Sequence, residues 1–136
     1  MKFANWQFGE LEYEDHHVLA FPAGIIGFEH LRKFVLVNDE DTDPFRWLIS
    51  LEDGAVGFPV LEASSVMPEY SLPAGESGEV LLIACLTGIP EESTVNLRSP
   101  VIVDNARREG KQIIVDNDLY SMQFPLFPAV SPSTGK

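Results

Sequence analysis

The sequence predicts an all-β protein, a small single-domain, barrel-like antiparallel sheet with short helical turns. Short apolar runs rich in β-branched and aromatic residues recur along the chain, and glycine and proline separate them. No long stretch repeats its apolar residues with the 3.6-residue period of a helix. The 136 residues fit one domain, and 45% of them are hydrophobic, which is enough for a core.

The first half of the chain contains six predicted strands. Residues 3–8 are short and aromatic, and residues 11–14 alternate between apolar and polar side chains. Four further runs are rich in β-branched and aromatic residues: 17–21, 33–37, 46–51 and 56–61. A short helical turn is expected at residues 29–32.

The second half begins with a continuous apolar run at residues 80–87, which is typical of a strand buried on both faces. Residues 101–104 and 112–116 are then expected to form a hairpin, in which Val101–Val103 pair with Ile113–Val115. A second short helical turn is expected at residues 91–93. We expect the barrel domain to span residues 1–127 and residues 128–136 to form a flexible tail.

Residues 21–29 read FPAGIIGFE and combine turn-forming with apolar residues. Pro22 can end a strand, and Gly24 and Gly27 tolerate backbone conformations that other residues resist. The pattern favours a barrel corner in which Ile25, Ile26 and Phe28 fold back as a plug over one end of the core.

The formal charge is −12, with 21 acidic and 9 basic residues, and most of the excess lies in residues 1–70. Such a surface disfavours nucleic acid and anionic membranes, and it favours encounter with a basic protein. Solubility alone is the other interpretation of this charge.

Metal and catalytic motifs are weak. Asp39, Asp41 and Asp43 have the spacing of a calcium loop, but Pro44 and Ser50 replace its turn glycine and bidentate glutamate. His16 and His17 would point to opposite faces of a strand, and Cys85 is expected to be a buried apolar residue. We therefore expect neither an enzyme nor a cofactor or metal.

The location is expected to be cytoplasmic. The N-terminus lacks the apolar stretch of a signal peptide, and no apolar run approaches the roughly 20 residues of a membrane span.

The element FPAGIIGFE, followed by KFVLV, PFRWLISLED and GFPV, resembles the first half of the FliW family. The stretch TVNLRSPVIVDNARREGKQIIVDNDLYSMQFPLF resembles the second half, although the middle segment is shorter than is usual in that family. The resemblance covers roughly residues 3–127 and implies a flagellar assembly factor that is not an enzyme. Such a protein binds flagellin and also CsrA, a small basic RNA-binding protein that represses flagellin translation. The resemblance further implies that the two partners compete and that CsrA is antagonised allosterically.

Three acidic sets are candidate partner-binding residues: Glu12, Glu14 and Asp15; Asp39, Glu40, Asp41 and Asp43; and Asp104, Asp116 and Asp118. Alternation along a strand would place Glu12 and Glu14 on one face, and the third set is expected to cluster at the strand ends of the closing hairpin. We favour the first set joined by the second. A small-molecule-binding barrel, an enzyme on such a scaffold, and a flagellin chaperone that never meets CsrA are the alternatives.

Overall fold

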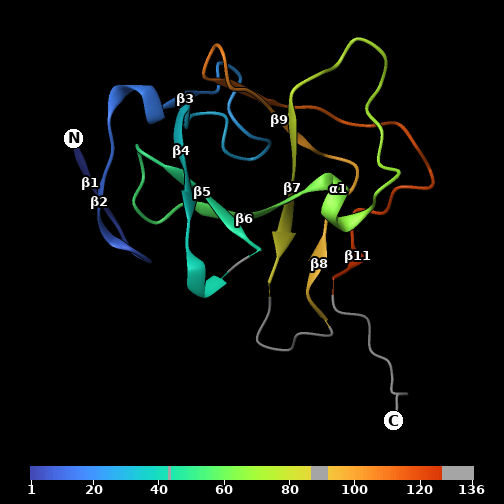
Figure 1. Cartoon of the computed structure of the whole chain (residues 1–136), viewed down its shortest axis with the longest axis horizontal. Helices are drawn as coiled ribbons and strands as arrows, with labels where there is room; N and C mark the ends of the chain where they lie inside the picture. Colours follow the sequence, from blue (N-terminus) through green and yellow to red (C-terminus); the bar gives the residue numbers. More distant parts are fainter. Residues whose placement is uncertain (43, 87–91, 127–136) are drawn as a thin grey trace.

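Seven strands form a closed barrel in the computed structural model, which describes residues 1–42, 44–86 and 92–126 (Figure 1). In order around the barrel they are β3 (Leu19–Ala20), β4 (Lys33–Asn38), β5 (Arg46–Ser50), β6 (Gly57–Glu62), β7 (Glu79–Cys85), β9 (Val101–Asp104) and β10 (Glu109–Gln112). Neighbouring strands are antiparallel except β10 and β3, whose parallel pairing closes the barrel. The predicted all-β barrel is therefore confirmed, with one parallel pair in its wall.

The interior of the barrel is filled by side chains. Alternation along β4 directs Phe34 inward, while Val35 packs on the outside. The interior cluster consists of Leu19, Phe21, Ile25, Leu31, Phe34, Leu48, Val60, Leu81, Val101 and Val103. Small barrels are stabilised by such a packed interior, because each buried aliphatic or aromatic side chain contributes about 1.5–3 kcal/mol.

A separate hairpin covers the outer face of β4 and β5. It consists of β1 (Lys2–Asn5) and β2 (Gly9–Glu12), which form their own two-stranded sheet. Its turn forms because the Asn5 side-chain oxygen accepts the N–H groups of Gln7 and Phe8, each at 2.8 Å. Phe8, Leu11 and Tyr13 then pack against Val35, Trp47 and Ile49. The predicted strand at residues 3–8 ends early for this reason.

The opposite side of the barrel carries a second cover, at the right of Figure 1, where the β1–β2 hairpin is at the left. Strands β8 (Thr94–Val95) and β11 (Phe124–Pro125) extend the sheet from β7, and helix α1 (Ala63–Val66) follows β6. Tyr70 and Tyr120 stack with their ring centroids 4.7 Å apart. Leu82, Val95, Leu97 and Val115 form the core of this cover.

The short helices differ from those predicted. Single 3-10 turns occupy η1 (Asp15–His17) and η2 (Glu40–Thr42). No helix forms at residues 29–32, where that prediction was wrong, because Leu31 enters the interior core directly after a tight turn. The turn expected at residues 91–93 lies partly outside the described residues, and the expected tail lies wholly outside them. Among the described helices, none is long and apolar enough to cross a membrane.

The closing hairpin has a different register from the predicted one. Asp104 accepts the N–H groups of Ala106 and Arg107, and Arg108 adopts a φ of 54°. This compact turn lets the second strand begin at Glu109, which pairs with Asp104. The pairing is shifted by three residues, so the Ile113 N–H donates to the Pro100 carbonyl oxygen at 3.2 Å and the Val115 N–H to that of Arg98 at 2.7 Å. The predicted pairing of Val101–Val103 with Ile113–Val115 was therefore wrong, and β10 ends at Gln112.

The FPAGIIGFE corner is confirmed in part. Gly24 has a φ of +70°, and a Cβ atom there would lie 2.6 Å from the Glu29 Cα atom, so glycine is required at this position. Ile25 is buried in the core, and Phe28 packs edge-on against Phe58. Ile26 is 55% exposed and is not part of the plug, because its N–H group donates to Gln112 at the surface.

Candidate functional site

The described part of the acidic loop, residues 39–42, lies at a cleft of about 710 Å³. Asp39 and Glu40 line this cleft at the end of β4. The loop is held by Thr42, whose hydroxyl donates to the Asp39 carbonyl oxygen and accepts from the Trp47 indole nitrogen at 2.9 Å. Asp41 is exposed in η2, and Asp43 lies outside the described residues.

Arg46 lies in the wall of the same cleft and is the partner of two acids. Its guanidinium group is 2.6 Å from a Glu79 carboxylate oxygen and 3.6 Å from a Glu62 oxygen. The other Glu79 oxygen accepts from the Asn105 amide at 3.3 Å. Sequence reasoning missed this pair, since residues 33 positions apart give no local signal of contact. The charge of Arg46 is thus directed to Glu79, while Asp39 and Glu40 face the cleft.

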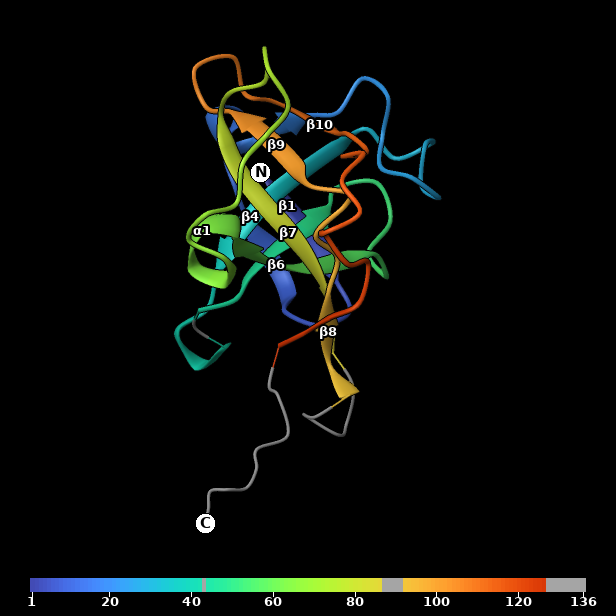
Figure 2. The ribbon, with the colours of Figure 1, turned by 90° about the vertical axis from the view of Figure 1, so that its right-hand side faces the viewer.

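An apolar cavity of about 380 Å³ continues from this cleft, and the two share Pro44, Phe45 and Ser65. The remaining residues that line it are Leu61, Val66, Phe124, Pro125 and Leu126. We call the combined surface the α1 groove, because Ser65 of α1 lies where its acidic half meets its apolar half. Both α1 and η2 lie on the same side of the barrel in Figure 2. The sequence carried no signal that β11 would line the same groove as the acidic loop.

The first acidic set surrounds a different depression. Glu12 is the last residue of β2, and Glu14 precedes η1 and donates its N–H to the His17 ring at 3.0 Å. Both glutamates line a cavity of about 380 Å³ together with Met1, Lys2, Tyr13 and His17. Backbone hydrogen bonds between Met1 and Tyr13 continue the hairpin beyond Glu12, and Glu14 is extended. Alternation therefore places the two exposed glutamates on one face, as predicted, while Tyr13 between them packs against the core. Asp15 is exposed at the start of η1.

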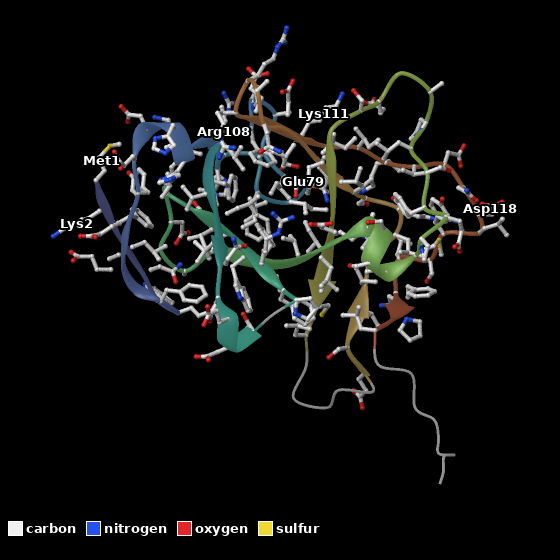
Figure 3. The ribbon with its side chains drawn as sticks, viewed as in Figure 1. Met1, Lys2, Glu79, Arg108, Lys111 and Asp118 are labelled. Carbon is white, nitrogen blue, oxygen red and sulfur yellow. The ribbon has the colours of Figure 1, made fainter. Side chains whose placement is uncertain are left out.

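The third acidic set does not cluster. Asp104 lies at the turn end of the β9–β10 hairpin, because it pairs with Glu109. Asp116 and Asp118 follow the opposite end, where Gln112 pairs with Val101. Asp118 contacts Arg98 at 3.3 Å and lies far from Lys111 (Figure 3). The expected cluster was wrong because an antiparallel hairpin places the end of its first strand at the turn and the end of its second strand at the opposite end.

The loop that precedes β7 lies beside the β9–β10 hairpin. Glu76 pairs with Lys111 at 2.6 Å, and both line a cleft of about 460 Å³ with Asp104 and Arg107. Acidic and basic side chains alternate in this cleft, so their charges largely offset one another.

Other titratable groups give no metal centre. His16 and His17 belong to η1, and their rings lie 4.1 Å apart instead of on opposite faces of a strand. Cys85 is exposed, contrary to prediction, because β7 ends there and only β8 pairs with it at that point. Within the described residues, no three His, Cys, Asp or Glu side chains could hold a metal ion.

The hydroxyl groups of Tyr70 and Tyr120 make hydrogen bonds within the second cover. The Tyr70 hydroxyl donates to the Leu97 carbonyl oxygen at 2.6 Å, and the Tyr120 hydroxyl accepts the Ser71 N–H at 3.0 Å. Burial, and secondly the nearby Tyr120, raise the pKa of Tyr70 to about 12. At the FPAGIIGFE corner, the Gly27 N–H donates to Glu29 at 3.0 Å and lowers the pKa of that carboxyl. Both groups stabilise local structure.

Comparison with known proteins identifies the family of this chain. The model of the FliW protein family matches residues 2–126, which include both covers of the barrel. The chain belongs to the FliW family. The flagellar assembly factor FliW of Thermotoga neapolitana is 40% identical over 128 residues, covering 85% of this chain and 86% of the relative. That of Thermotoga maritima is 38% identical over 138 residues, covering 92% and 93%.

The fold agrees with that assignment. A crystal structure of the flagellar assembly factor FliW superimposes with a TM-score of 0.86 at 28% identity. The match covers 95% of this chain and 99% of that one. This chain therefore shares the fold of that FliW structure over almost its whole length.

Proposed function

We propose that this FliW-family protein is a flagellar assembly factor that binds flagellin and the translational regulator CsrA. Binding to CsrA relieves its repression of flagellin translation. The observation that carries the proposal is the family match along residues 2–126, together with relatives named flagellar assembly factor FliW at up to 40% identity. The proposed location is the cytoplasm, where flagellin is made.

Competition between the two partners supplies the regulation. When flagellin accumulates, it occupies the protein, and CsrA is free to repress. When flagellin is exported, the protein is released and binds CsrA away from the RNA-binding surface, so the antagonism is allosteric. Such coupling requires only that CsrA binds RNA less tightly while this protein is attached.

The charge of the chain supports a basic partner. At −12 it is a poor ligand for RNA, whose phosphates bind lysine and arginine. It is well suited to a basic RNA-binding protein, because complementary charge raises the rate of encounter. The acidic sets around Glu12, Asp39 and Asp118 are the proposed source of this attraction.

The proposal assigns no catalytic role. The interior, where a small-molecule-binding barrel would hold its ligand, is occupied by side chains such as Phe21, Phe34 and Leu48. The clefts formed by the described residues lie between surface elements, as at Asp39 and Glu12. Surface clefts of this kind suit contact with a macromolecule.

Calorimetric titration of the purified protein with purified flagellin and, separately, with purified CsrA tests the proposal. We expect both to bind, and we expect saturating flagellin to prevent CsrA from binding. Binding of flagellin without CsrA would reduce the function to that of a flagellin chaperone. Binding of neither would overturn the proposal.

A further inference from the structure

We propose that the α1 groove docks a segment of a partner protein that carries lysine or arginine beside apolar side chains. This rests on the proposed function, because it names the surface and the chemistry through which the protein meets its basic partner. The groove has an acidic half and an apolar half that share Pro44, Phe45 and Ser65, so one bound segment can reach both.

The acidic half attracts cations. Its lining includes the carboxylates of Asp39, Glu40 and Glu62 and one cation, Arg46. The shorter contact of Arg46, at 2.6 Å, is to Glu79, outside that lining, which leaves acid in excess around the opening. Phe45 lines the cleft with these acids and is half-buried, and an aromatic ring attracts a guanidinium or ammonium group placed over its face.

The apolar half gives the segment something to bury. Val66, Phe124 and Leu126 line it and are each half-buried, so part of each side chain meets solvent. Covering these side chains removes apolar surface from water, which is the main source of affinity in protein association. Charge would then steer the segment into the groove, and apolar burial would retain it.

Net charge also favours a basic partner over a second copy of this chain as the occupant of the α1 groove. A second copy of this chain would bring another net charge of −12 to the acidic half, which opposes self-association there. The depression around Glu12 and Glu14 is a weaker candidate, because Lys2 lines it and it shares no lining residue with the apolar cavity at Phe124. The α1 groove is therefore the better match to a basic, partly apolar segment.

A matched pair of substitutions in α1 tests the site. Ser65 lines both halves, whereas the preceding Ser64 is also exposed and lines neither. Ser65→Trp should fill the junction and weaken binding of purified CsrA more than about tenfold. Ser64→Trp should leave the affinity unchanged. Thermal unfolding of each variant checks that the barrel is intact, and Ser65→Arg blocks the junction with a cation if the tryptophan does not fold.

Two further variants distinguish steric blockade of the α1 groove from the loss of a hydrogen bond or of charge. The Ser65 hydroxyl donates to the Glu62 carbonyl oxygen at 2.7 Å, so Ser65→Ala removes that hydrogen bond without filling the groove and should still bind. Glu40→Gln combined with Glu62→Gln removes two charges of the acidic half. It should weaken CsrA binding roughly threefold to tenfold at low salt and much less at 1 M salt.

The outcomes distinguish this proposal from the function on which it rests. If the parent protein binds CsrA and Ser65→Trp binds as tightly, the groove is not the site, and the proposed function stands. Loss of flagellin binding alone on Ser65→Trp, or conversion of a dimer to a monomer, overturns the basic partner as occupant. If the parent protein binds neither CsrA nor flagellin, the proposed function fails and the groove assignment fails with it.

Discussion

Arg46 and Glu79 show how one side-chain pair connects distant parts of the barrel. Their side chains are only 23% and 25% exposed, so solvent screens the pair incompletely. Glu79 also accepts from Asn105 in the β9–β10 turn, whose oxygen accepts from Arg108 at 3.0 Å. Polar contacts from Arg46 to Glu79, then to Asn105 and Arg108, therefore connect the acidic half of the α1 groove to the β9–β10 hairpin.

Glu79→Gln should lower the free energy of unfolding by about 1–3 kcal/mol, because Arg46 then keeps a partly buried charge without the closer of its two carboxylate partners. Urea denaturation measures the change. Lys2→Gln is the control, since the Lys2–Glu10 pair is exposed and 3.8 Å apart, and it should alter stability by less than about 0.5 kcal/mol. Equal losses in the two variants would contradict the structural role given to Glu79.

Gly110 is required for space. The ring of Phe21, which is fully buried, lies against its backbone, and a Cβ atom at Gly110 would overlap that ring. Gly110→Ala should cost about 1–3 kcal/mol through overpacking. Combining it with Phe21→Leu should cost less than the sum of the two single changes, because the smaller side chain makes room. Simple additivity in denaturation experiments would argue against this contact.

Tyr70 predicts a loss of stability in alkaline solution. Its pKa is raised to about 12 in the folded protein, chiefly by burial, so the folded state holds the proton where the unfolded state has begun to lose it. The free energy of unfolding should therefore fall as the pH rises from about 10 to about 12. Stability measured across this range should decline less steeply in Tyr70→Phe than in the parent protein.

At the scale of elements, the β1–β2 hairpin covers the barrel through one face. Phe8 packs edge-on against Trp47 with ring centroids 5.9 Å apart, whereas Trp6 is 85% exposed at the same turn. Among the described residues the hairpin has no strand pairing with the barrel sheet, and one backbone hydrogen bond, from the Trp6 N–H to the Gly54 carbonyl oxygen at 2.9 Å, joins its turn to the loop after β5. Side-chain packing is therefore central to its attachment.

Two aromatic truncations in this hairpin should therefore differ. Phe8→Ala should destabilise the protein by about 2 kcal/mol, which is below the 3–5 kcal/mol of a fully buried phenylalanine because Phe8 is half-buried. Trp6→Ala should change stability by less than about 0.5 kcal/mol. Thermal unfolding compares the two, and a larger effect of Trp6→Ala would show that the hairpin packs differently.

At the scale of the whole molecule, the charge of −12 predicts that salt weakens binding to a basic partner. The Debye length falls from about 10 Å at 0.1 M salt to about 3 Å at 1 M, so exposed charge pairs lose most of their attraction. CsrA affinity should decrease across this range by calorimetry. An unchanged affinity would show that electrostatic attraction contributes little to the free energy of binding.

Flagellin binding should respond differently. An amphipathic flagellin helix would bury mainly apolar surface, so its affinity should depend less on salt and its binding should show a negative heat-capacity change. Calorimetry at several temperatures measures that change, and its absence would contradict an apolar contact.

The sequence by itself determined the fold class, most of the strands and the family. Apolar runs separated by glycine and proline are local signals, and they predicted β4, β5, β6, β7 and β9 within one or two residues of their observed bounds. The FPAGIIGFE corner was predictable for the same reason, since proline and glycine act on the backbone where they stand. The acidic excess was countable without any structure.

Only the tertiary structure decided where these pieces meet. The side-chain bonds of Asp104 and the φ of Arg108 set the hairpin register, in which Glu109 pairs with Asp104. Pairing of β5, β6 and β7 brought Arg46 to Glu79, and pairing of β8 with β7 and β11 placed β11 in one groove with Pro44 and Phe45. Contacts between residues far apart in the chain depend on barrel closure and packing, which no local pattern encodes, and the α1 groove is formed by such contacts.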